Sequence, residues 1–476
     1  MASELVDRPF LAYLAGLSAD IMEQLYQSEA CCLAIFRLLP PVSQQCVAMM
    51  VFSKDFDITK QCNPEQINVV VDNVTLLQKL HLLVEDDRTG IVSLQSFFRY
   101  NYMTTTQKSA VETSGIGIRE LDTKTRKAAS KDLYQKAVER WECILTYLAL
   151  PSDSAVKNVS TNTRELFQHI GFTRQTTREM EITSLGFQFL LLSRNEQIWT
   201  YLIYYLKYLE ATSPGHVVVL LEFFFRLCLC VTASDVADRL NADESSNRNI
   251  TTPFVIDDNW NDTINSFLVH LRELGLVFIR KRKDGFFFIT PLLISLVATD
   301  SIREGLIEVG RDKGFLVTET NYRLYAYTNS ELHLSVLATF TEPHCRFPNF
   351  VVVHMTRESV RRALQAGITA RQITQYLRSN SHWKSIEAHG ALHCVPPTVV
   401  DQVHMVHLWE EERERLVCQD CVMYSTFESE EEYVEMRNFC TENQILLFEI
   451  PTQHVIVVTD DGHELVRDWK TQKANS

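Results

Sequence analysis

The sequence predicts an α+β protein made of tandem winged-helix modules, a compact α+β domain and a C-terminal β-α-β-β-α dimerisation unit. Three observations support this fold class. A pattern of helix followed by hairpin recurs three times, a stretch of strand-like alternation begins near residue 315, and the end of the chain alternates short apolar runs with two helical segments. The 476 residues are enough for several domains of ordinary size.

The three copies of the repeat share a helix, a short strand, a polar turn and a second strand. Apolar residues at helical spacing open each copy, and two apolar runs flank the turn. Asp284-Gly285 is a hairpin signal in the third copy, Thr89-Gly90 occupies the matching place in the first, and the second has no glycine there. This arrangement is typical of winged-helix modules. The copies are LLQKLHLLVEDDRTGIVSLQSFF (76–98), LFQHIGFTRQTTREMEITSLGFQFL (166–190) and LRELGLVFIRKRKDGFFFITPLLI (271–294).

Changes in composition divide the chain into segments. Residues 104–131 contain no aromatic residue and are rich in Thr, Ser, Lys and Gly, which predicts a linker with Gly115 and Gly117 in a flexible joint. The polar stretch 237–259 predicts a loop inside a domain. The predicted segments are an N-terminal helical and winged-helix domain (1–103), the linker (104–131), a second and a third winged-helix module (132–212 and 213–312), an α+β domain (313–417) and a C-terminal unit (418–476).

The predicted α+β domain opens with FLVTETNYRLYAYT (315–328), whose alternation and tyrosines favour strands. A helix is expected over about 330–340. Thr356 is placed to cap a later helix that ends at Gly367, and Thr369 to cap another. That last helix should direct three residues inward: Ile373, Tyr376 and Leu377.

The C-terminal unit reads strand (CVMYSTF), acidic helix (SEEEYVEMRNFC), strand (ILLFEI), strand (HVIVVT) and helix (GHELVRDWK). A sheet of three strands keeps at least one open edge, and an open edge is a place where another chain can pair. The sequence therefore predicts a partner strand, or a second copy, on this unit.

Charge and composition exclude some classes of function. The formal net charge is −14, and residues 401–476 hold 17 acidic against 6 basic residues, so this end of the chain should not bind nucleic acid. The start of the chain lacks a signal peptide, which predicts that the 12 cysteines are reduced thiols of an intracellular protein. The apolar run 216–231 is interrupted by Glu222 and Arg226 and is too short to span a bilayer, so we expect a buried core helix and no membrane contact.

The turn of the third hairpin carries four consecutive cations, Arg280, Lys281, Arg282 and Lys283. These residues are candidates for contact with DNA or with an acidic partner, and the alternative is a solvated turn. A DNA-binding winged-helix regulator that uses this wing is the second functional hypothesis. The preceding helix has only Arg272 as a full positive charge and also carries Asp262 and Glu273, so its charge does not suit binding in a DNA major groove.

A candidate metal site is H-x2-H-x10-C-x2-C at His404, His407, Cys418 and Cys421, which has the right ligand types for tetrahedral zinc. The histidines lie in a strongly helical segment and no knuckle turn accompanies the cysteines, so we expect no metal. The sequence has no phosphate-binding loop, no H-E-x-x-H and no G-x-S-x-G motif. We therefore expect no catalytic site and no cofactor.

Four blocks together resemble one known family: ITSLGFQFLL (182–191), LRELGLVFIRKRK (271–283), NYRLYAYT (321–328) and GITARQITQYLR (367–378). The chain resembles the 52-kilodalton-class subunit of the general transcription and DNA-repair factor TFIIH, the yeast Tfb-two family, over nearly its whole length. The resemblance implies a nuclear, non-catalytic scaffold that acts in RNA polymerase II transcription initiation and nucleotide-excision repair. Residues 104–131 are longer than expected for that family, and the region before Gly90 matches it only loosely.

The resemblance also implies partners. The region 313–417 would bind the XPB helicase and stimulate its ATPase, the final unit would pair with the smallest TFIIH subunit, and other core subunits would bind the N-terminal modules. Promoter or damaged DNA would be reached only through the complex. Because Tyr and Arg dominate protein interfaces, we assign to the helicase interface Glu319, Tyr322, Arg323 and Tyr325, although a packed strand with aromatic residues in the core is the alternative. To the small-subunit interface we assign Ile445, Leu447, Phe448, Val455 and Val457.

Overall fold

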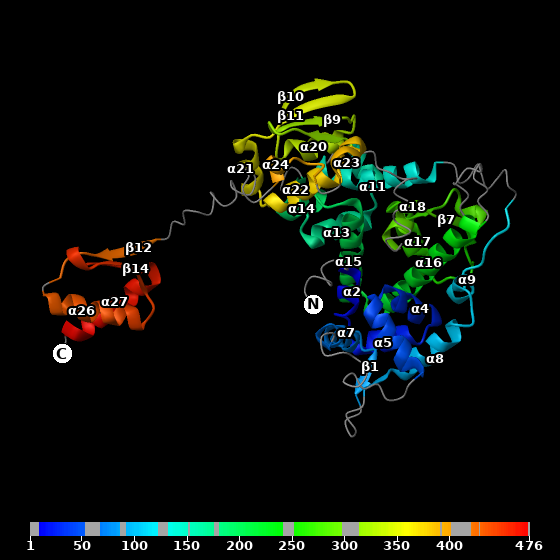
Figure 1. The fold of residues 1–476 in the computed structure, drawn as a ribbon, viewed down its shortest axis with the longest axis horizontal. Coiled ribbons are helices and arrows are strands. Elements are labelled where there is room, and N and C mark those ends of the chain that lie inside the picture. Colours follow the sequence, from blue (N-terminus) through cyan, green and yellow to red (C-terminus); the bar gives the residue numbers. More distant parts are fainter. Residues whose placement is uncertain are drawn as a thin grey trace. The chain divides into compact units, whose positions relative to one another are not determined.

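The structure, a computed structural model, divides into two compact units, Met1–His407 and Leu408–Ser476, and each is considered by itself. Helices and small antiparallel sheets alternate along the chain (Figure 1), which confirms the α+β class. The residues that the structure describes are 9–52, 67–85, 92–121, 132–150, 153–175, 180–240, 252–297, 314–390, 393–400, 420–427 and 429–474.

The chain begins with helices that pack on one another and on α15 (Arg194–Thr212). Phe10 stacks on Trp199 of α15, with ring centroids 4.8 Å apart. The hydroxyl of Tyr26 donates a hydrogen bond to the carbonyl of Leu80. These early helices are α2 (Pro9–Leu14), α3 (Ala19–Tyr26), α4 (Glu29–Leu38), α5 (Pro41–Phe52) and α7 (Ile67–Lys79).

The helix and hairpin expected in each repeat are present in all three copies, and each hairpin is antiparallel. The turns of the first two copies, including Thr89-Gly90, lie outside the described residues. In the third copy, Asp284-Gly285 forms the turn, and Gly285 has a φ of 69°. The copies are α7 with β1 (Leu83–Glu85) and β2 (Val92–Leu94), α13 (Thr161–Ile170) with β3 (Thr173–Gln175) and β4 (Met180–Ile182), and α17 (Asp262–Glu273) with β6 (Val277–Phe278) and β7 (Phe286–Ile289).

The same hydrogen bonds end the helix in each copy, so the repeat is one of geometry as well as sequence. A residue with positive φ follows the helix, and the next N–H donates to the carbonyl five positions earlier, as in a Schellman motif. The residues with positive φ are His81, Gly171 and Gly275. The donor–acceptor pairs are Leu82 to Leu77 (3.0 Å), Phe172 to Phe167 (2.9 Å) and Leu276 to Leu271 (3.0 Å).

The third hairpin is extended by β5 (Pro253–Val255) into a sheet of order β5-β7-β6. A short 3-10 turn, η1 (Arg282–Asp284), lies between β6 and β7. The remaining helices of this region are α8 (Ser96–Thr105), α9 (Ala110–Ser114), α11 (Leu133–Ala149), α12 (Asp153–Asn158), α14 (Ser184–Leu190), α16 (Pro214–Leu240) and α18 (Pro291–Val297).

The apolar run 216–231 lies in α16, which is longer than the sequence indicated. By length and composition its Pro214–Val231 part would suit a membrane span, but more than half of that part is buried inside this chain. It contacts α4, α9, α15 and α17. Glu222 forms an ion pair with Arg226 and accepts a hydrogen bond from Ser28. The prediction of a buried core helix agrees with this packing.

The first part of residues 104–131 is packed, contrary to the prediction of an unstructured linker. Ser109 forms a capping box with Glu112 at the start of α9, and Ile116 is 4% exposed. Gly117–Arg119 then pairs with β5. The composition argument fails here because α16 and β5 supply the apolar surface and the backbone partners that these residues lack among themselves. Residues 122–131 lie outside the described residues.

The expected domain after residue 313 contains a four-stranded antiparallel sheet of order β10-β11-β9-β8. Thr356 and Thr369 cap α21 and α22 as predicted, and Ile373, Tyr376 and Leu377 are buried. Helices α20 and α22 lie on one side of this sheet (Figure 1). The elements are β8 (Leu316–Thr318), β9 (Arg323–Ala326), α20 (Glu331–Ala338), β10 (Glu342–Phe347), β11 (Phe350–His354), α21 (Arg357–Gln365), α22 (Ala370–Ser379), α23 (Trp383–His389) and α24 (Pro397–Val400).

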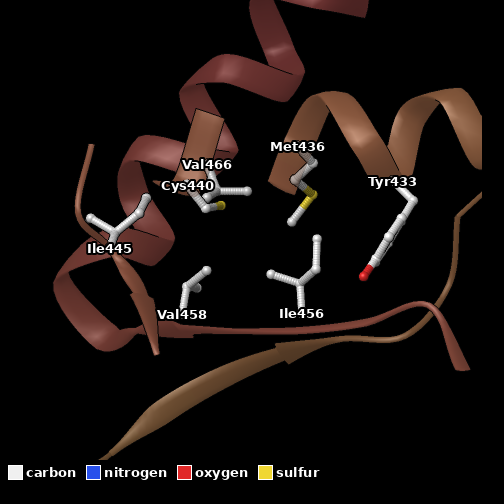
Figure 2. Close-up of a cluster of buried hydrophobic side chains, with 7 residues drawn as sticks. All are labelled: Tyr433, Met436, Cys440, Ile445, Ile456, Val458 and Val466. Atoms are coloured by element: carbon white, nitrogen blue, oxygen red, sulfur yellow. The ribbon is translucent and has the colours of Figure 1, made fainter. Parts of the chain in front are cut away.

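The C-terminal unit has the predicted order of elements, and its sheet order is β12-β14-β13, which leaves two outer strands. Two helices cover one face of the sheet and enclose a small core, shown in Figure 2. The core residues are Tyr433, Met436, Cys440, Ile445, Ile456, Val458 and Val466. The elements are β12 (Cys421–Tyr424), α26 (Glu430–Glu442), β13 (Leu446–Ile450), η2 (Pro451–Gln453), β14 (Val455–Thr459) and α27 (Asp460–Ala474).

Candidate interaction surfaces

The turn between β8 and β9 holds two of the four residues predicted at the helicase interface, Glu319 and Tyr322, and Arg323 follows as the first residue of β9. The backbone N–H of Glu319 donates to the carbonyl of Arg323 at 2.9 Å. The side chain of Asn321 donates to Glu319 at 3.0 Å and accepts from the N–H of Arg323 at 3.0 Å. Tyr322 has a φ of 66°, in the left-handed region that non-glycine residues rarely adopt. Arg323 is exposed, whereas Glu319 and Tyr322 are half-buried.

The fourth residue, Tyr325, lies on the same face of the sheet as Arg323, because residues two apart in a strand point the same way. The opposite face is buried, with Leu324 and Ala326 at 0% exposure. Arg323 is the cross-strand neighbour of His354, which in turn neighbours Glu342. The row that contains Tyr325 consists of Cys345, Val352, Tyr325 and Val317.

Aromatic residues continue this face beyond Tyr325. The rings of Tyr325 and Phe350 stack with centroids 5.9 Å apart. Phe350 also contacts the rings of Tyr327 (4.8 Å) and Phe347 (6.0 Å), which are 55% and 54% exposed. The outer face of β8 to β11 therefore passes from a charged row through a mixed row to an aromatic row. The sequence did not single out Phe347 or Phe350; their short alternating strand, FVVVH, is the signal that was available.

The C-terminal sheet has a second exposed apolar face, on the side opposite α26 and α27. Val457 has Met423 and Phe448 as its cross-strand neighbours. Met423 is 63% exposed, Phe448 59% and Leu447 44%. Leu447 lies where the register shifts between β13 and β14. Three predicted small-subunit residues, Leu447, Phe448 and Val457, are therefore accessible.

The other two predicted small-subunit residues differ in position. Val455 is half-buried and, as the first residue of β14, pairs with Ile450. Ile445 is 8% exposed and belongs to the core, where Figure 2 shows it beside α27. A Cβ on Gly462 of α27 would lie 2.8 Å from that of Ile445. Ile445 is thus a core residue rather than one of the exposed face.

The four cations of the third hairpin, Arg280 to Lys283, are exposed. Arg280 lies 3.6 Å from the carboxylate of Asp284. The helix that precedes this hairpin, α17, is covered along one flank. Phe267 and His270 of α17 stack against Tyr205 of α15, with centroids 6.1 and 4.5 Å apart.

The covered flank of α17 ends in a buried polar network. The hydroxyl of Tyr201 lies 3.2 Å from Nε2 of His270, and Nδ1 of His270 lies 3.6 Å from Glu273. Burial raises the pKa of Glu273, but hydrogen bonds from His270 and from Ser160 outweigh this effect and lower the pKa to about 2. Glu273 is therefore charged at neutral pH and joins α17 to the start of α13.

The candidate zinc ligands cannot be placed together, because His404, His407 and Cys418 lie outside the described residues. Cys421 is exposed on β12. Within the ranges that the structure describes, no group of three or more His, Cys, Asp or Glu side chains is arranged to hold a metal ion.

Comparison with known proteins places the whole chain in one family. Residues 12–383 match the family model "Transcription factor Tfb2", and residues 401–470 match "Transcription factor Tfb2 (p52) C-terminal domain". The chain is 31% identical to the general transcription and DNA repair factor IIH subunit TFB2 of Yarrowia lipolytica, over 96% of this chain and 95% of that protein. It is 30% identical to the subunit of the same name from Kluyveromyces lactis, over 96% of both chains. With general transcription factor IIH subunit 4 of Dictyostelium discoideum it shares 29% identity over 96% of this chain and 97% of that protein. The chain therefore belongs to the Tfb2 family of transcription and DNA repair factor IIH subunits.

Proposed function

We propose that the chain is a non-catalytic scaffold subunit of the TFIIH core that anchors the XPB helicase and stimulates its ATPase. The protein would act in the nucleus, where it would take part in transcription initiation by RNA polymerase II and in nucleotide-excision repair. Two things support the proposal: the names of the relatives, which are subunits of a general transcription and DNA repair factor IIH, and the exposed outer face of β8 to β11, where Arg323 and Tyr325 lie together. Other TFIIH core subunits would bind the helix–hairpin modules, and DNA would be reached through the complex.

The chemistry of the outer face of β8 to β11 suits a protein partner. Arg323 presents a planar guanidinium next to an apolar and aromatic surface, and Tyr and Arg are the residue types that most often carry binding energy at interfaces. The hydrogen bonds around Asn321 fix the turn before any partner arrives, which lowers the entropic cost of binding. Tyr322 keeps an unfavourable backbone conformation in this turn, and such strain is often found at functional sites.

The smallest TFIIH subunit is the partner that we propose for the C-terminal unit. The row Met423, Val457 and Phe448 offers an apolar sheet face, and the outer strands β12 and β13 offer open backbone edges. Exposed apolar sheet surface of this kind is normally covered by another chain. Leu447 and Val455 extend this surface, while Ile445 supports it from the core.

We also propose that the three helix–hairpin copies are winged-helix modules and that the domain boundaries predicted from the sequence are correct. The recurring helix, hairpin and hydrogen-bond pattern supports them. In such modules the helix before the hairpin reads DNA when the module is a DNA binder. The open flank of α17 carries Asp262, Val269 and Arg272, so it lacks the cations for that role. The four exposed cations at 280–283 favour a DNA-binding regulator as the second candidate function, but α17 does not support it.

The decisive experiment compares the full-length chain with its Arg323→Glu variant for binding to purified XPB helicase and for stimulation of the helicase ATPase. If Arg323 is desolvated in the interface, charge reversal should weaken binding by about 2 to 5 kcal/mol. Arg371→Glu, at an exposed position of α22, is the matched control and should bind normally. Unchanged affinity of a folded Arg323→Glu protein would reject the interface.

The same assay separates activation from recruitment. At helicase and scaffold concentrations far above the dissociation constant, simple recruitment predicts no difference in ATPase rate between free and bound helicase. An allosteric activator raises the rate even at saturation, because it favours an active helicase state.

The small-subunit proposal has its own test. Phe448→Glu places a charge on the exposed C-terminal sheet face, on the outer strand β13, and should abolish co-purification with the smallest TFIIH subunit. Glu464→Lys changes charge at an exposed position of α27, the helix that packs on the other face of the sheet, and should leave pairing intact. Normal pairing of the Phe448→Glu protein would exclude this face.

A further inference from the structure

Two cations from outside the third hairpin are held against it. The guanidinium of Arg119 lies 5.6 Å from the ring centroid of Phe286 in β7 and donates a hydrogen bond to the carbonyl of Asp284. The ammonium of Lys136, in α11, lies 5.3 Å from the ring centroid of Phe278 in β6. Both contacts are of cation–π type. These contacts place Arg119 and Lys136 beside the hairpin whose turn carries the four cations Arg280 to Lys283.

A small apolar cluster explains why these two segments meet there. Leu133 packs with Phe286 and Phe288, and Leu121 and Phe278 pack against them. The approach is close, because a Cβ on Gly285 would lie 3.0 Å from Nη1 of Arg119. The cations are thus positioned by packing. We call Arg119, Lys136, Arg280, Lys281, Arg282 and Lys283 the basic surface.

The charge of the basic surface stands out in an acidic chain. Asp284 neutralises part of Arg280, and Glu120 follows Arg119, but the balance of the surface stays positive. The chain as a whole carries −14. Such a local reversal of sign attracts a negatively charged partner, which the acidic remainder of the chain would repel.

A strand edge lies beside these cations. The N–H of Arg119 donates to the carbonyl of Pro253 at 3.0 Å, and the carbonyl of Gly117 accepts from Val255 at 2.8 Å. In an antiparallel pair with these two bonds, the N–H and C=O of the residue between them, Ile118, point away from β5. The side chain of Ile118 is 51% exposed. Among the described residues no backbone hydrogen bond reaches Ile118, so an open backbone edge and an apolar side chain adjoin the basic surface.

We propose that the basic surface, together with the edge at Ile118, binds an extended acidic segment of a partner protein. Carboxylates of the segment would pair with the wing cations, its main chain would hydrogen-bond to Ile118, and an apolar side chain would cover that residue. A DNA duplex fits less well. A duplex does not pair with a strand edge and would leave the side chain of Ile118 without an apolar partner. In addition, α17, the helix that would enter its groove, is covered along one flank by α15.

The test measures fluorescence anisotropy of the full-length chain with three labelled probes: a short peptide in which Glu alternates with Val, the same peptide with Gln for Glu, and a DNA duplex. The variants are Lys281→Glu/Lys283→Glu and Ile118→Asp. The matched control is Arg361→Glu/Arg362→Glu, which reverses two exposed cations of α21. Thermal unfolding checks that each variant is folded.

The acidic peptide should bind and the Gln peptide should not. Lys281→Glu/Lys283→Glu should weaken binding of the acidic peptide by about tenfold or more. Ile118→Asp should also weaken it, while the α21 control leaves it unchanged. Equal or tighter binding of the duplex that is lost in the wing variant would assign the surface to nucleic acid and overturn the proposal. Equal losses in the wing variant and the α21 control would reduce the effect to net charge and also overturn it. None of these residues belongs to the proposed helicase face, so either result leaves that proposal to its own experiment.

Discussion

Glu273, near the end of α17, accepts a hydrogen bond from the backbone N–H of Ser160, the residue that caps the start of α13, at 2.8 Å. The two residues are 113 positions apart in the sequence. One carboxylate therefore joins the helix of the third helix–hairpin copy, α17, to that of the second, α13. Since the same carboxylate also accepts a hydrogen bond from Thr163 at 3.2 Å and lies close to His270, removing it takes a polar partner from two buried residues.

Glu273→Ala should lower the free energy of unfolding by about 2 to 3 kcal/mol, because hydrogen bonds to a buried charged group are lost. Glu165→Ala, at an exposed position on α13, removes the same charge without a buried partner and should change stability by less than about 0.5 kcal/mol. Denaturant unfolding at neutral pH distinguishes them. Equal stabilities for the two variants would show that the network contributes nothing.

The low pKa of Glu273, about 2 in the folded chain, makes part of the stability depend on pH. The carboxylate ionises near pH 4.5 when unfolded, so its contribution is complete above about pH 5 and is lost as the pH falls toward 2. Glu273→Gln lacks this contribution. The difference in unfolding free energy between the unsubstituted chain and Glu273→Gln should therefore shrink as the pH falls from 5 to 3. A constant difference would mean that the pKa of Glu273 is not lowered by folding.

Gly275 should be intolerant of any side chain. It has a φ of +78°, and an added Cβ would lie 2.3 Å from the carbonyl oxygen of Ala137 in α11. Gly275→Ala must move backbone and should cost more than about 2 kcal/mol. Gly115 has a similar φ of +65° but open space around it, so Gly115→Ala should cost only about 1 kcal/mol. Urea midpoints of the two variants give the comparison, and a reversed order would contradict the close approach of α17 and α11.

Substitution of Tyr322 by glycine should lower the affinity for the helicase while it leaves the stability of the chain nearly unchanged. The φ of Tyr322, 66°, is unfavourable for tyrosine and free of cost for glycine. Tyr322→Gly should therefore change the unfolding free energy by less than about 1 kcal/mol, since relief of strain offsets the lost side-chain contacts. Affinity for XPB helicase should nevertheless fall if the ring lies in the interface. Loss of stability with unchanged affinity would assign Tyr322 a purely structural role.

The sequence by itself determined the features that depend on local chemistry. Alternation and helical spacing identified the three helix–hairpin units, and Thr356 and Thr369 marked helix starts, because a capping hydroxyl satisfies backbone N–H groups only a few residues away. The order of elements in the C-terminal unit followed in the same way. These signals are read within one turn or one strand, so a single sequence contains all of them.

Tertiary structure decided what depends on distant partners. Ile116 and Arg119 lie in a segment with a linker's composition, yet α16, β5 and the hairpin supply the surface that orders them. Ile445 looked like a strand-face residue, but its neighbours Val466 and Gly462 place it in the core. The strand pairing that sets Arg323 beside His354 and Tyr325 beside Val352 was equally absent from the sequence pattern. Periodicity states which residues share a face, whereas the free energy of burial is settled by whatever packs on that face, and those atoms come from elsewhere in the chain.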